Sequence, residues 1–142
     1  MTDTRSDPAK GVVTGAPNLI LRAEGAAVLA ASVWAYALAG GGWWMFAVLL
    51  LAPDLFMLGY LRGPRLGAAA YNLGHTYLVP LGLLALGQVA GAGLLTALGL
   101  IWAAHIGLDR MLGYGLKHPW GFKATHLTGG LAAAPAAPAA RA

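Results

Sequence analysis

Four long apolar stretches make up most of the chain, and each is long enough to form one membrane-spanning helix. A spanning helix needs about 20 predominantly apolar residues. The stretches cover residues 18–39, 43–61, 66–88 and 92–112. The connections between them are short, so neighbouring helices should run antiparallel. The pattern predicts an all-α fold, a polytopic membrane protein with a four-helix up-and-down transmembrane bundle.

The composition agrees with a membrane environment. Of the 142 residues, 58% are hydrophobic and only 10% are charged, which is too apolar for a soluble domain of this size. Residues 1–17 form a polar N-terminal arm, and residues 128–142 form an Ala/Pro-rich tail that we expect to be disordered. The transmembrane domain, with an interfacial C-terminal segment, is expected over residues 18–127. Cysteine is absent, which excludes disulfides and thiolate chemistry.

The charge distribution predicts the orientation. All nine Lys and Arg residues fall on one side of the predicted bundle, and basic residues in short loops remain cytoplasmic. Both termini should therefore be cytoplasmic, in a multi-pass protein of a bacterial inner membrane. The net charge of +4 suits a face that borders anionic lipid. No basic stripe interleaved with aromatic residues indicates nucleic-acid binding, so the lipid bilayer is the expected partner. An assembly of identical chains is compatible with this pattern.

Polar side chains gather near the cytoplasmic end of all four predicted helices. They are Arg22, Glu24, Asp54, Asn72, His75, His105, Asp109 and Arg110. Ionisable groups at the centre of a spanning helix cost roughly 2.5–3.5 kcal/mol on insertion scales, and they point toward protein or a water-filled cavity. We therefore expect a polar cavity that binds a small ligand or a metal ion, in which the two arginines act as counter-charges or anion ligands.

Two histidines of this layer are candidate metal ligands. Asn72 and His75 are three residues apart, and His105 and Asp109 are four apart, so each pair shares one face of its helix. His75 and His105 lie at similar distances from the loop that joins their helices, so their rings should approach one another. Imidazole and carboxylate groups bind zinc and iron. His75, His105 and Asp109 are thus the candidate ligands of a divalent zinc or iron ion, although no established metal motif such as His-Glu-x-x-His is present.

Two other interpretations of the polar layer remain open. The layer could be purely structural, holding the helices of a membrane scaffold or interaction protein together. Alternatively, a proton-linked small transporter could use Glu24, because the architecture resembles that of the small multidrug-resistance exporters. The sequence does not decide whether the protein is an enzyme.

The segment after the fourth helix is amphipathic and should lie at the membrane interface. Its expected anchors are Lys117, Trp120, Phe122 and Lys123. The aromatic rings would lie at the depth of the lipid headgroups, and the lysines would meet headgroup phosphates.

Several short motifs together resemble one known family. They are Leu21-Arg22-Ala23-Glu24-Gly25, Ala52-Pro53-Asp54-Leu55, Tyr71-Asn72-Leu73-Gly74-His75-Thr76-Tyr77, and the stretch from Ile101 to Leu127 that contains His105, Asp109 and Arg110. The set resembles a small bacterial membrane family catalogued as a domain of unknown function (DUF4260). The resemblance implies four helices and no established activity.

Overall fold

The structure, a computed structural model, describes residues 12–119, 122 and 125–127. Across these residues the regular elements are helical, and one isolated bridge joins Lys117 to Thr125. The elements are α1 (Gly15–Leu38), α2 (Trp43–Leu49), the 3₁₀-helix η1 (Ala52–Arg62), α3 (Pro64–Gly74), α4 (Leu78–Val89) and α5 (Gly93–Leu112). The predicted all-α class is confirmed for this part of the chain. The predicted tail, residues 128–142, and most of the N-terminal arm lie outside the described residues.

Three stretches are long and apolar enough to cross a membrane: Gly15–Leu38, Trp43–Arg62 and Gly93–Leu112. They correspond to the first, second and fourth predicted spans. The third predicted span, residues 66–88, is not one helix, because α3 ends at Gly74 and α4 begins at Leu78. Pro80 explains the interruption, since proline has no N–H to donate to the carbonyl four residues earlier and its ring clashes with that carbonyl. Within the first turn of α4 the missing N–H costs nothing.

The second of these stretches, Trp43–Arg62, changes from the α-helix α2 to the 3₁₀-helix η1 partway along its length. A 3₁₀-helix has three residues per turn, so its side chains align in rows three residues apart. The three rows of η1 differ in character. One row contains Asp54, Met57 and Tyr60. The second row contains Leu55, Leu58 and Leu61, which are all exposed. The third row contains Phe56 and Gly59, which face α3. The exposed leucine row is the surface suited to lipid.

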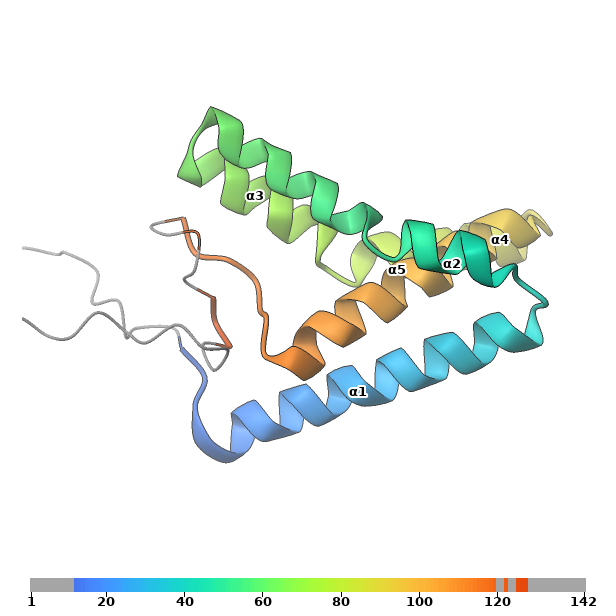
Figure 1. The fold of residues 1–142 in the computed structure, drawn as a ribbon, viewed down its shortest axis with the longest axis horizontal. Coiled ribbons are helices and arrows are strands. Elements are labelled where there is room, and N and C mark those ends of the chain that lie inside the picture. Colours follow the sequence, from blue (N-terminus) through green and yellow to red (C-terminus); the bar gives the residue numbers. More distant parts are fainter. Residues whose placement is uncertain (1–11, 120–121, 123–124, 128–142) are drawn as a thin grey trace, which may run out of the picture.

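The helices form two packed groups (Figure 1). In one, η1 and α3 form an antiparallel hairpin; in the other, α5 packs against both α1 and α4. Glycines allow the helices of the second group to approach closely. A Cβ atom on Gly107 would lie 2.7 Å from the backbone nitrogen of Leu29 and 2.8 Å from the carbonyl oxygen of Gly25. Small residues serve the same purpose at helix interfaces within membranes.

The C-terminal segment after α5 folds back between the hairpin and α1 (Figure 1). Gly113 ends α5 in the left-handed conformation, with φ of 92°, which glycine adopts without steric cost. Asn72 then binds the backbone of Lys117 twice: its Oδ1 accepts from the N–H at 2.7 Å, and its Nδ2 donates to the carbonyl at 2.9 Å. Further along, Leu127 is fully buried. The segment is therefore docked onto the end of the molecule that contains the polar residues.

Candidate metal centre

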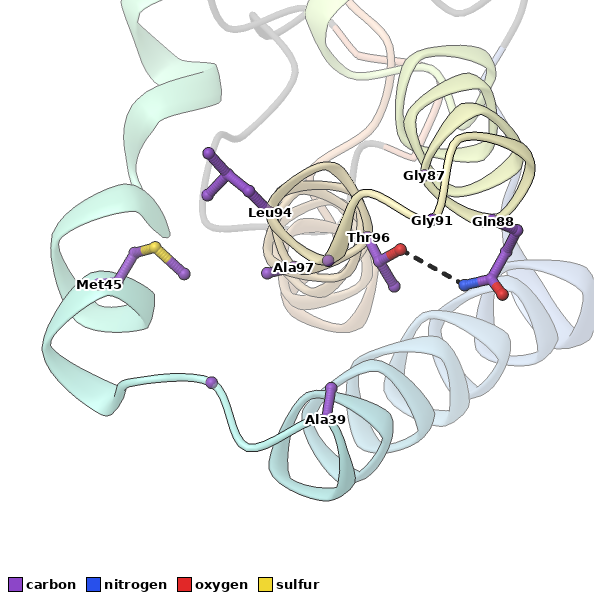
Figure 2. Close-up of a pocket in the computed structure, with 10 residues that line it drawn as sticks. Ala39, Met45, Gly87, Gln88, Gly91, Leu94, Thr96 and Ala97 are labelled. Carbon is purple, nitrogen blue, oxygen red and sulfur yellow. Dashed lines mark hydrogen bonds between the residues drawn. The ribbon is translucent and has the colours of Figure 1, made fainter.

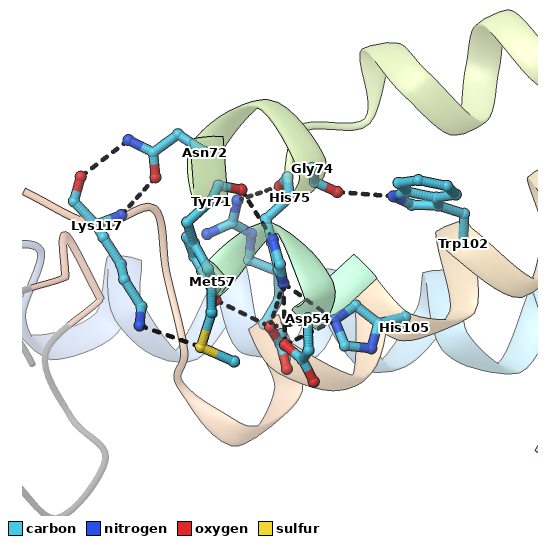
Figure 3. Close-up of polar contacts among 11 residues, drawn as sticks. Asp54, Met57, Tyr71, Asn72, Gly74, His75, Trp102, His105 and Lys117 are labelled. Carbon is cyan, nitrogen blue, oxygen red and sulfur yellow. Dashed lines mark hydrogen bonds and ion pairs between the residues drawn. The ribbon is translucent and has the colours of Figure 1, made fainter. Parts of the chain in front are cut away.

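Four ionisable side chains from three elements converge at one point (Figure 3). Asp54 lies in the first turn of η1, His75 immediately follows α3, and His105 and Asp109 lie one turn apart on α5. One ligand atom from each residue lies within 4.8 Å of the other three. The histidines are almost completely buried, whereas the side chain of Asp54 is 34% exposed. Asp54 is thus the most accessible of the four.

The predicted approach of the two histidines is confirmed. Their Nε2 atoms are 3.1 Å apart. Nε2 of His75 lies 3.5 Å from Oδ1 of Asp54 and 3.5 Å from Oδ2 of Asp109. The corresponding distances from Nε2 of His105 are 3.6 and 3.7 Å. Five of the six separations between the four ligand atoms are thus 3.1–3.7 Å, and all of them are within 4.8 Å.

These separations can be compared with those between the ligands of a metal ion. Zinc binds nitrogen and oxygen ligands at about 2.0–2.2 Å, so the ligands of a regular tetrahedral site are roughly 3.3–3.6 Å apart. Adjacent ligands of an octahedral site with the same bond lengths would be only about 2.8–3.1 Å apart. The four nitrogen–oxygen distances, 3.5–3.7 Å, are nearer to the tetrahedral value, whereas the 3.1 Å between the two histidine nitrogens is at the upper end of the octahedral range. The cluster is therefore small enough to surround one ion.

Hydrogen bonds outside this cluster orient its ligand atoms. Nδ1 of His75 lies 2.8 Å from the carbonyl oxygen of Tyr71. A carbonyl can only accept, so Nδ1 donates and Nε2 presents its lone pair to the centre. The Tyr71 hydroxyl donates to Oδ2 of Asp109 at 3.1 Å, and the Tyr71 ring stacks on that of His75 with centroids 3.7 Å apart. Tyr71 therefore orients two of the four ligands.

The arrangement contains more hydrogen-bond acceptors than donors at its centre. Nε2 of His75 and the oxygens of Asp54 and Asp109 all present lone pairs to the centre, and His105 can supply at most one N–H. Clustered acceptors of this kind are costly in a buried site. A bound metal ion would engage all four atoms at once.

The end of α3 is completed by groups from α5. The last carbonyls of a helix have no partner within it. Here Nε1 of Trp102 donates to the carbonyl of Gly74 at 2.7 Å, and Nη2 of Arg110 donates to that of His75 at 3.3 Å. The interruption between α3 and α4 is thus stabilised by the helix that carries two of the candidate ligands.

Four of the eight residues predicted to line a cavity meet at this centre, and the others are placed differently. Nε of Arg22 donates to the carbonyl of Met111 at 2.9 Å, near the end of α5. Glu24 is exposed on α1. Asn72 holds the backbone of Lys117, and Arg110 adjoins the centre through His75. Asp54 was predicted to line the cavity but was not among the predicted metal ligands. The three-residue period of η1 indicates which residues lie on the same face of the helix as Asp54.

Two of the predicted interfacial anchors lie within the described residues. The Lys117 ammonium lies over the rings of Phe122, Tyr71 and Tyr60, at 3.5, 4.4 and 5.2 Å from their centroids. Burial lowers the pKa of Lys117, whereas attraction by Asp54 and Asp109 acts in the opposite direction. Trp120 and Lys123 lie outside the described residues.

A separate pocket lies at the opposite end of the molecule (Figure 2). Its volume is about 490 Å³, and it is lined mainly by small and apolar residues of the helix ends and of the connections between them. The amide of Gln88 donates to the Thr96 hydroxyl at its edge, at 3.3 Å. None of the lining residues is ionisable, so this pocket offers no charged ligand for a metal.

Comparison with known proteins identifies the family. The family model described as a domain of unknown function (DUF4260) matches residues 18–129, and the chain therefore belongs to this family. No curated protein and no solved structure matches the chain.

Proposed function

We propose that this DUF4260 protein is an integral membrane protein that binds one divalent transition-metal ion, preferentially zinc. The ligands are Asp54, His75, His105 and Asp109. The convergence of their four ligand atoms, all within 4.8 Å of one another, carries the proposal. Two imidazoles and two carboxylates suit zinc and iron. The four nitrogen–oxygen separations favour zinc, because zinc sites are commonly tetrahedral, whereas iron with such ligands usually has additional open positions.

The proposal places the centre within the cytoplasmic half of a bacterial inner membrane, with both termini in the cytoplasm and four passes through the bilayer. Three helices of suitable length and composition support the membrane location, and the basic residues support the orientation. At about 1.5 Å per residue, His105 lies roughly 10 Å before the end of α5. Irregular backbone at such depth is tolerated where it is buried in protein. Residues 75–77, between α3 and α4, adjoin the centre itself.

The ion would join the two packed groups of helices. The η1–α3 hairpin supplies Asp54 and His75, and α5 supplies His105 and Asp109. Binding would thus dock the hairpin onto α5, and the partly exposed Asp54 would face incoming water or substrate. The excess of acceptors weighs against a purely structural polar layer without an ion. The exposed position of Glu24, outside the cluster, weighs against a transporter based on that residue.

Metal analysis of the full chain, purified in mild detergent, tests the proposal. We expect one zinc ion per chain, and intense visible absorption of the tetrahedral type when cobalt(II) replaces zinc. The double variant His75→Ala/His105→Ala and the single variant Asp54→Asn should lose the ion or bind it much more weakly. Glu24→Gln is a matched control, because it removes an exposed carboxylate that lies outside the cluster. Absence of bound metal, or equal metal content in all variants, would overturn the proposal.

A further inference from the structure

Two cationic side chains beside the metal ligands have hydrogen-bond donors that remain unused. Nζ of Lys117 contacts Sδ of Met57 at 3.8 Å and three aromatic rings. Among the described residues, no carboxylate or carbonyl oxygen is within hydrogen-bond distance of it. Arg110 uses Nη2 for the carbonyl of His75, but its Nη1 is buried without a partner in the described part of the chain. Both residues could therefore bind an additional acceptor.

Both cations are held close to the proposed centre. The Lys117 ammonium lies 4.4 Å from the ring centroid of Tyr71, whose hydroxyl binds Asp109. The two hydrogen bonds between Asn72 and the Lys117 backbone hold that backbone, so the side chain starts from a defined position (Figure 3). Arg110 directly follows Asp109 on α5. The cations are thus part of the surroundings of the metal ligands.

The charges around the centre balance without a metal and fail to balance with one. With neutral imidazoles, the two carboxylates, Asp54 and Asp109, offset the two cations, Arg110 and Lys117. A divalent ion adds two positive charges that no further acidic residue among the four metal ligands neutralises. Uncompensated charge is costly in a partly buried, low-dielectric site. Binding of the metal would therefore leave the four ligands and the two cations with a net charge of +2 (two carboxylates, two cations and the divalent ion), which favours a bound anion with two negative charges.

We propose that Lys117 and Arg110, together with the metal ion, form a subsite for a doubly charged phosphate group, and this inference rests on the proposed metal centre. A phosphomonoester or free phosphate carries about 1.5–2 negative charges at neutral pH and has several acceptor oxygens. Arginine and lysine are the usual partners of such groups. A carboxylate or a phosphodiester carries a single charge and would leave the site positive. The group is either free phosphate or the headgroup of a lipid such as phosphatidic acid.

The subsite predicts that metal and phosphate bind cooperatively. Coupling between two ligands is reciprocal and typically amounts to roughly 5- to 150-fold in affinity. Zinc affinity should therefore increase roughly tenfold or more when a phosphate dianion is present. Lys117→Met keeps a long apolar side chain and removes the charge. In this variant zinc should bind more tightly without phosphate, and phosphate should have little further effect, whereas structural damage would weaken zinc binding in all conditions.

Zinc competition with a chromophoric chelator, on the full chain in phosphatidylcholine vesicles, provides the test. One arm adds inorganic phosphate, a second includes phosphatidic acid, and a third has chloride at equal ionic strength. An increase in zinc affinity in the first or second arm supports the inference and identifies the source of the phosphate group. Lys117→Arg should retain the effect, and Arg65→Gln, which removes an exposed charge elsewhere, is the control.

The outcomes separate the two proposals. Zinc binding that is equal in all three arms, or coupling that persists in Lys117→Met, would overturn the phosphate subsite alone. Failure of the wild-type chain to bind zinc in any arm would overturn the metal centre, and with it this inference.

Discussion

Removing the amide of Asn72 should release the C-terminal segment. Asn72→Ala deletes both hydrogen bonds to the Lys117 backbone, at 2.7 and 2.9 Å. A hydrogen bond contributes about 0.5–1.5 kcal/mol net, so the loss should be roughly 1–3 kcal/mol. Because 1.4 kcal/mol corresponds to a factor of ten, the undocked state should become about 5- to 150-fold more populated.

Limited trypsin digestion in detergent measures this population. Cleavage after Lys117 requires the segment to leave its site, and at low protease concentration its rate follows the open population. Asn72→Asp keeps the acceptor for the Lys117 N–H but loses the donor, so its cleavage rate should be intermediate. Gln88→Ala, which removes an exposed amide at the opposite end, is the control. If Asn72→Ala were cleaved at the wild-type rate, the two hydrogen bonds would not hold the segment.

Three further predictions concern packing, pH and topology. Gly107→Ala should lower the free energy of unfolding in detergent by about 1–3 kcal/mol, because its methyl group would collide with the α1 backbone; Gly82→Ala, which has open space, should not. Burial, reinforced by Arg110, lowers the pKa of His126 below its ordinary value of 6.5. Its contribution to stability should therefore be complete above pH 6.5 and decline below it, and this decline should be smaller in His126→Gln. A reporter active only outside the cytoplasm should be active at Gly41 and silent after Leu127, and the reverse result would invert the proposed orientation.

The sequence predicts those features that depend on the length of the apolar stretches and on the distance of a residue from the nearest loop. The apolar stretches locate α1 and α5, and equal distances from one loop predict the contact between His75 and His105, whose Nε2 atoms are 3.1 Å apart. The structure departs from the prediction where the conformation of the backbone or a contact with residues distant in the sequence determines the position of a side chain. Asn72 binds the backbone of Lys117 rather than the centre, because the chain reverses after α5. The third predicted span is interrupted before Pro80, and the interruption also depends on Trp102 and Arg110, which donate to the carbonyls at the end of α3.

The 3₁₀ geometry of η1 connects the metal centre to the proposed phosphate subsite. With three residues per turn, Asp54, Met57 and Tyr60 share one face, and the last two contact the Lys117 side chain. In an α-helix each step of three residues would rotate the side chain by about 60°, so Tyr60 would lie about 120° from Asp54. The residues that contact the cation would then turn away from the ligand. The same geometry places Leu55, Leu58 and Leu61 on the exposed face, so one backbone conformation accounts for both the lipid-facing surface and the alignment of the site.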